Sequence, residues 1–179
     1  MKIVALSILA FMLGMASIQA QHLGSSKGAS AVGVGTGLPY GGIGGRLSFN
    51  PGDNVTMFGG LGYNLGSLGA NAGLQLIIPS QKQTEFYFTG MYGYNAVIVS
   101  KMPGARSRSY YGPSLGMGLK INSLLSEGNY WDVGLLAPVR SSRYKDDIEA
   151  MENHPYVKLE SKPWPILFYV GYNFNIGSK

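Results

Sequence analysis

The sequence predicts an all-β protein, an antiparallel, up-and-down transmembrane β-barrel of about eight strands. Three observations lead to this fold class. Large apolar residues alternate with small or polar ones along many short segments, the chain begins with an export signal, and the remainder is rich in glycine and poor in charge. Successive side chains on a strand point to opposite faces, so this alternation gives each strand one apolar face and one polar or tightly packed face.

The clearest alternation lies close to the C-terminus, in residues 164–177. From Gly171 onward the odd positions are small or polar. Aromatic side chains lie near both ends of the apolar face, as in the aromatic girdles of barrels that cross a membrane. The even positions carry the large side chains: Trp164, Ile166, Phe168, Val170, Tyr172, Phe174 and Ile176.

Residues 1–20 have the features of an export signal peptide. Lys2 supplies a positive charge, residues 3–15 are apolar, and small residues precede an expected cleavage site after Ala20. The apolar run is shorter than the ~20 residues that a spanning helix needs. We therefore expect residues 21–179 to form a single barrel domain.

Seven further segments alternate in the same way, and turn residues separate them. We expect Leu38 and Tyr94 to lie on the apolar faces of their strands. Pro113 cannot donate a hydrogen bond to a sheet ladder, so we expect its strand to bulge or to start late. The seven segments span residues 29–38, 41–49, 54–63, 68–78, 84–98, 109–121 and 129–137.

The lengths of the connections favour the same fold. Outer-membrane barrels have short periplasmic turns and longer outer loops. With the N-terminus in the periplasm, both long connections, residues 99–108 and 140–163, fall on the outer side. The connections around Pro51, Ser80 and Leu124 are short and fall on the inner side.

The face opposite the apolar one should line a narrow lumen. An eight-stranded barrel is only just wide enough for side chains to fill it. We expect inward glycines to make room for large inward residues; these glycines are Gly35, Gly60, Gly73, Gly116 and Gly134, and the large residues are Phe58, Tyr87, Tyr130 and Tyr169. We also expect a charge network in the lumen, made by Arg46, Glu85, Lys120 and Asp132.

The alternative is a soluble, lipocalin-like ligand-binding barrel whose apolar face points inward. Its exterior would then carry only those few charges, which is sparse for a whole surface exposed to water. Because lipid can cover an apolar exterior and a closed barrel satisfies every backbone group, the membrane interpretation is favoured.

The loop of residues 140–163 contains the densest charge in the chain. Residues 144–153 could form a short helix, and a solvated loop that caps the barrel is the simplest interpretation. A loop that contacts a partner is the functional alternative. Its candidate interaction residues are Arg143, Lys145, Asp146, Asp147, Glu149 and Glu152.

Several classes of function are disfavoured. The chain has no cysteine, which excludes disulfides and thiolate metal sites, and we expect no metal site and no cofactor. The formal net charge of +5 falls to +4 once Lys2 is removed, so we expect no nucleic-acid partner. Lipid-A-modifying enzymes do exist on barrels of this size, but His154 near Ser141, Ser142 or Glu152 is the only constellation available. We expect no enzymatic activity.

Residues 29–177 resemble small eight-stranded outer-membrane barrels of the OmpA-transmembrane or OmpX kind. The segment Val170-Gly171-Tyr172-Asn173-Phe174 is similar to the C-terminal signal read by the barrel-assembly machinery, although residues 175–179 follow it. The resemblance implies a bacterial outer-membrane location, contact with outer-membrane lipid, and the assembly machinery as a partner during insertion.

Together these observations favour a structural or surface-interaction role. The rigid barrel would present loops 99–108 and 140–163 to an extracellular ligand or partner. The alternative is porin-like: a narrow pore that passes water or small solutes through a glycine-lined lumen.

Overall fold

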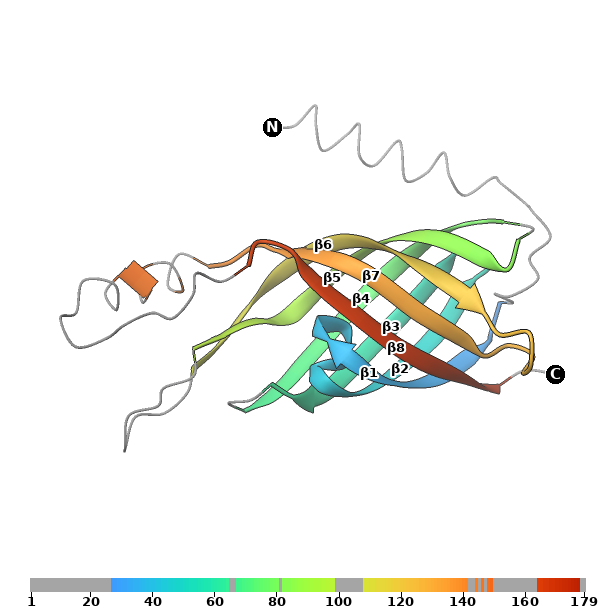
Figure 1. Cartoon of the computed structure of the whole chain (residues 1–179), viewed down its shortest axis with the longest axis horizontal. Helices are drawn as coiled ribbons and strands as arrows, with labels where there is room; N and C mark the ends of the chain where they lie inside the picture. Colours follow the sequence, from blue (N-terminus) through green and yellow to red (C-terminus); the bar gives the residue numbers. More distant parts are fainter. Residues whose placement is uncertain are drawn as a thin grey trace, which may run out of the picture.

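Eight strands form one closed barrel in which every neighbouring pair is antiparallel (Figure 1). The computed structural model describes residues 27–64, 67–80, 82–98, 108–141, 144, 146, 148–149 and 164–177, and the expected signal peptide lies outside them. This confirms the predicted all-β, up-and-down architecture. The strands are β1 (Ser30–Gly37), β2 (Gly42–Gly52), β3 (Val55–Tyr63), β4 (Leu68–Ile78), β5 (Thr84–Ile98), β6 (Arg108–Asn122), β7 (Tyr130–Pro138) and β8 (Leu167–Gly177).

Two strand ends differ by three residues from the sequence-based boundaries, and the others agree within one residue. β2 continues through Pro51 to Gly52, so the turn that follows it is shorter than expected. β8 begins only at Leu167, paired with Leu136 of β7, and Trp164 and Ile166 precede it. Pro165 lacks the N–H that a ladder requires, which accounts for the later start.

The expectation for Pro113 was wrong. β6 begins at Arg108, well before the proline, and its register with β5 is unbroken at Pro113. The Pro113 carbonyl accepts a hydrogen bond from the Val139 N–H (2.9 Å), so this residue's backbone points toward β7. The β6–β7 register ends at Ser114, so the missing N–H falls where the ladder stops.

The irregularity lies instead in β5, where the register with β6 shifts between Tyr94 and Ala96. Gly93 adopts a φ of 152°, outside the range that other residues favour. A bulge of this kind interrupts the in–out alternation of a strand. Tyr94 is therefore buried in the lumen, and its predicted place on the apolar outer face was wrong.

Leu38 was also misplaced, because β1 ends at Gly37 and the chain turns into the barrel. Residues Leu38–Tyr40 form a short 3₁₀ helix, η2, that is buried and contacts β1, β2, β3, β4, β5 and β8 (Figure 1). The Asn71 amide donates a hydrogen bond to the Leu38 carbonyl, and the Asn173 amide donates one to the Tyr40 hydroxyl (3.1 Å). The first outer connection is therefore a plug in the lumen.

The inward glycines form a cradle for this plug. A Cβ added at Gly35 or Gly171 would meet the Tyr40 ring, and one added at Gly60 would meet the Pro39 carbonyl. Gly35 and Gly60 thus make room for η2, whereas the sequence interpretation assigned them to large strand residues. The expected role holds for Gly73 beside Phe58 and for Gly134 beside Tyr169, while Gly116 faces Leu136 and the Leu135 carbonyl.

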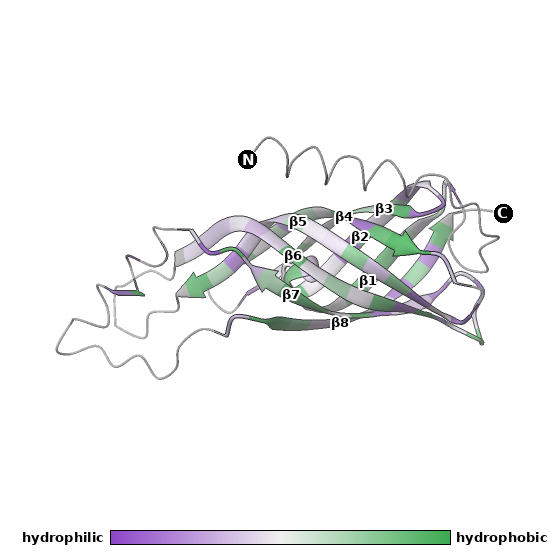
Figure 2. Ribbon diagram, turned by 90° about the horizontal axis from the view of Figure 1, so that it is seen from above, coloured by the Kyte–Doolittle hydropathy of each residue, from purple (hydrophilic) through white to green (hydrophobic). Residues whose placement is uncertain are grey.

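The outer face of the barrel is apolar. Hydrophobic and hydrophilic residues alternate along the ribbons (Figure 2). Large side chains such as Leu61, Leu115 and Phe168 are more than half exposed, whereas Tyr87 and Tyr169 are buried inside. Within the described residues, no helix is long and apolar enough to cross a membrane.

Two adjacent glycines of β3 test the cradle. Gly60→Ala places a methyl group against the Pro39 carbonyl of η2, so we expect the free energy of unfolding to fall by about 1–3 kcal/mol, as in other overpacked interiors. At the outward-facing Gly59, the nearest atom to an added Cβ is 4.0 Å away. Gly59→Ala should leave stability unchanged or slightly raised. Urea titration of both refolded variants measures the difference; equal effects would contradict the assignment.

Candidate functional site

An ion pair crosses the lumen at the level where η2 ends. Arg46 on β2 donates a hydrogen bond to Asp132 on β7, and both side chains are buried. Gln75 on β4 supports the pair, because its carbonyl accepts a bond from Arg46 (2.8 Å) and its amide lies 3.4 Å from the Asp132 carboxylate. Three strands on different sides of the barrel are thereby joined through the interior.

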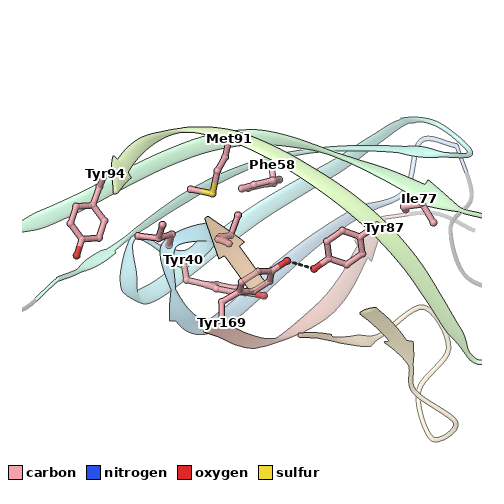
Figure 3. Packing of buried hydrophobic residues seen from close by; sticks show 9 residues of the cluster. Tyr40, Phe58, Ile77, Tyr87, Met91, Tyr94 and Tyr169 are labelled. Carbon is pink, nitrogen blue, oxygen red and sulfur yellow. Dashed lines mark hydrogen bonds between the residues drawn. The ribbon is translucent and has the colours of Figure 1, made fainter. Parts of the chain in front are cut away.

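Two tyrosines complete the surroundings of Asp132. The Tyr87 hydroxyl donates a hydrogen bond to the second carboxylate oxygen, and the hydroxyls of Tyr87 and Tyr169 are hydrogen-bonded to each other (Figure 3). Because Tyr87 uses its proton on Asp132, Tyr169 donates in the second bond. The carboxylate thus receives several donors, as a buried charge requires.

The Arg46 guanidinium also lies against aromatic faces. It is 4.4 Å from the centre of the Phe58 ring and 5.8 Å from that of Tyr40 in η2. Cation–π contacts of this kind are strongest where water is excluded. The charge network and the plug are therefore neighbours in the lumen.

A second pair lies beside the first. The Lys120 ammonium is 3.9 Å from the Glu85 carboxylate and 4.2 Å from the centre of the Tyr130 ring. Lys120 is the cross-strand partner of both Glu85 and Asp132, so the two pairs are adjacent. The structure therefore brings Arg46, Glu85, Lys120 and Asp132 together in the lumen, with each acid next to a base.

This arrangement fills one part of the lumen with paired charges and aromatic rings. Each carboxylate lies next to a base, and Asp132 also receives a hydrogen bond from Tyr87. No cluster of three or more His, Asp or Glu side chains that could hold a metal occurs in the part of the chain that the structure describes. Phe58, Tyr87 and Tyr169 pack with η2 as the apolar part of the same filling (Figure 3).

A separate cluster lies at the outer end of the barrel, where the long strands β5 and β6 extend beyond their neighbours. The last β5 residue in register with β4 is Gly93, and beyond it Ala96, Tyr110, Tyr144 and Ile148 pack together. The Tyr110 and Tyr144 rings meet edge to face at 5.0 Å. We call the outer ends of β5 and β6, together with Tyr144 and Ile148, the outer platform.

Tyr144 anchors the start of the long loop. Its N–H lies 3.3 Å from the Ser141 hydroxyl, and the Arg140 guanidinium is 5.5 Å from its ring centre. Arg140 also donates to the Trp164 carbonyl and so joins the two ends of the loop. Sequence analysis missed this anchor; the signal available was an aromatic residue within an otherwise charged segment.

The candidate interaction loop is described only in part. Asp146 and Glu149 are exposed, and Tyr144, Asp146, Ile148 and Glu149 have helical backbone conformations. The other candidate residues, Arg143, Lys145, Asp147 and Glu152, lie outside the described residues, as do residues 99–107 of the other loop. Of the constellation considered for catalysis, only Ser141 lies within them.

No protein-family model matches the chain, and no curated protein sequence matches it. Among solved structures, the chain is similar to the N-terminal β-barrel domain of OprF from Pseudomonas aeruginosa. The two share 16% sequence identity with a TM-score of 0.41, and the match covers 84% of this chain and 100% of that one.

A double-mutant cycle tests the central ion pair. Arg46→Met leaves Asp132 buried without its main partner, so the free energy of unfolding should fall by about 3–5 kcal/mol. Adding Asp132→Asn removes the stranded charge while keeping an acceptor for Tyr87, and should recover much of the loss. Urea titrations in vesicles measure the coupling. If Arg46→Met and Asp132→Asn each lower the free energy of unfolding by less than about 1 kcal/mol and their effects add, the pair does not hold the barrel together.

Proposed function

We propose that this chain is an integral β-barrel of the bacterial outer membrane with a structural or surface-interaction role and without enzymatic activity. The observation that carries the proposal is the polarity of the barrel wall, which is opposite to that of a soluble protein. Large apolar residues point outward around the barrel, whereas Arg46, Glu85, Lys120 and Asp132 are buried inside.

Water is a poor solvent for such a surface. Keeping apolar area in water costs about 25 cal/mol per Å², and the outward side chains of every strand contribute area. Aromatic residues also mark both ends of the outer face, with Tyr63 and Tyr111 at one end and Trp131 and Phe174 at the other. Lipid as the surrounding medium and aromatic girdles at its interfaces account for both features.

The two ends of the barrel support an orientation. The start of β1, the end of β8 and the short turns lie at one end, and the strand ends that the long connections join lie at the other (Figure 1). This asymmetry is typical of periplasmic turns and outer loops. At the periplasmic end, the outward Tyr172 and Phe174 rings of β8 meet edge to face at 4.9 Å, which offers the assembly machinery an aromatic contact during insertion.

The filling of the lumen favours a closed barrel over the pore. η2 occupies one level of the lumen, and the two ion pairs with their tyrosines lie next to it. A soluble ligand-binding barrel is disfavoured for the same reason, because its interior would need an apolar cavity in place of these buried charges.

The outer platform is the part best suited to contact a partner. Its base is ordered by the Tyr110–Tyr144 contact and by the Arg140 bond to Trp164. A pre-ordered segment loses less conformational freedom on binding than a free loop does. The exposed Asp146 and Glu149 stand on this base and are available to a partner outside the cell.

Location and closure are tested together. We expect the mature protein in the detergent-extracted outer membrane, with faster gel mobility unheated than boiled, because a closed hydrogen-bonded barrel resists unfolding. In planar bilayers the refolded protein should give no stepwise currents. Recovery as a soluble periplasmic protein would sink the membrane proposal, and regular current steps would replace it with the pore.

The roles of the loop's anchor, Tyr144, and of residues 150–162 can be tested by separate variants. Tyr144→Ala removes an aromatic pair worth about 0.5–1.5 kcal/mol beyond the area it buries, so trypsin added to whole cells should cut the loop faster. Glu149→Ala, at an exposed position four residues after Lys145, is the control and should leave the rate unchanged. Replacing residues 150–162 by a short Gly/Ser linker should preserve heat-modifiability but weaken cell-surface binding. Equal cleavage rates for both point variants would show that the loop is not anchored.

A further inference from the structure

The turn between β6 and β7 carries two leucines that nothing in the described structure covers. Leu124 is 84% exposed and Leu125 is 99% exposed, the highest values among the large hydrophobic residues described. The turn lies at the end of the barrel where the C-terminus is found (Figure 1). Exposed single leucines are ordinary, but an adjacent pair at the tip of a short turn needs an explanation.

The turn has a defined conformation. The Ser123 N–H donates to the Asn129 carbonyl (2.8 Å), and the Leu125 N–H lies 3.3 Å from the Ser123 hydroxyl. Asn129 also accepts a bond from the Asn175 N–H (3.0 Å), which ties the base of the turn to β8. Gly128 has a φ of 80°, and a Cβ there would meet the Asn175 side chain. These contacts give the turn that carries the two leucines a defined conformation.

The other two turns at this end are polar. Asp53 lies at the tip of the β2–β3 turn and accepts a bond from the Lys27 N–H (3.2 Å). The β4–β5 turn contains Ser80 and the exposed residues Lys82 and Gln83. Polar residues are what a turn surrounded by water normally carries. The environment of the β6–β7 turn therefore differs from that of its neighbours.

The leucines continue the apolar outer face. Ile121 and Trp131 are cross-strand partners one pair before the ends of β6 and β7, and Trp131 is half exposed. Leu124 follows Ile121 by three residues, at most about 10 Å along the chain. The headgroup layer of a bilayer is about 5–8 Å deep on each side. Because the folded turn is shorter than this extended limit, the boundary layer of the same membrane is within reach of the leucines.

We propose that the β6–β7 turn is a membrane-surface anchor whose leucines enter the interface of the periplasmic leaflet. The inference rests on the proposed membrane location. The lipid is the occupant because it already covers the adjoining outer face, so no other partner has to be recruited. Glu127, which is exposed at the far side of the turn, remains at the level of the headgroups. The anchor fixes the depth of one side of the barrel.

The chain has no native cysteine, so single-cysteine variants can report the environment of chosen positions. Leu125→Cys, Lys82→Cys and Leu119→Cys are each labelled with a polarity-sensitive fluorophore and reconstituted into phosphatidylethanolamine/phosphatidylglycerol vesicles. Lys82 reports a polar turn at the same end, and Leu119 reports the outer wall. We expect the label at position 125 to emit at shorter wavelength than the label at 82, to be quenched by chain-brominated lipid, and to resist aqueous iodide.

The three labels separate the two levels of the proposal. If the label at position 119 reports lipid while the label at position 125 behaves like the label at position 82, the proposed anchor is wrong and the membrane barrel stands. If position 125 is shielded from iodide but not quenched by brominated lipid, a protein contact covers the turn and the anchor is again wrong. If position 119 also reads water, the membrane location itself fails and the anchor fails with it.

Discussion

The space enclosed by eight strands is hardly wider than the side chains that project into it, and the organisation of this chain follows from how that space is filled. One level of it is filled by a short piece of backbone, η2, which can enter only where the surrounding walls lack Cβ atoms. The adjacent level takes charged and phenolic side chains. The narrow lumen must be filled without steric overlap. This one requirement accounts both for the glycines on β1, β2, β3 and β8 and for the acids and bases on β2, β5, β6 and β7.

The same requirement governs the electrostatics. A charge inside a narrow lumen cannot keep its hydration shell, so it must find a counter-charge and hydrogen bonds there. Asp132 illustrates this, since Arg46 and Tyr87 both donate to it and the amide of Gln75 lies nearby. The interior becomes a set of cross-links between strands that are distant along the ladder. Rigidity of this kind suits a scaffold that presents a loop cluster at one rim.

Alternation was enough to predict the strands and the inward direction of the four charged residues, because both depend on a period of two along a single strand. The closed barrel needed the export signal, the low charge and the connection lengths as well. The errors have a different origin. Leu38 continues the alternation of β1 in sequence, yet the chain leaves the sheet because a glycine-lined space inside accepts it. Tyr94 is displaced by a bulge, and Pro113 is tolerated because β7 ends beside it. Tyr144 is buried against β5 and β6, which lie far from it in the sequence. In each case the deciding neighbour is distant in sequence, where local periodicity carries no information.

The position of η2 also links the two ends of the chain. Tyr40 packs against Gly171 and accepts a hydrogen bond from Asn173, and both belong to the last strand. This half of its binding site does not exist until β8 pairs with β1. Placement of the β1–β2 connection in the lumen is therefore coupled to closure of the barrel at the β1–β8 seam. Opening the barrel at β1–β8 must release Tyr40, and unseating Tyr40 must loosen the seam.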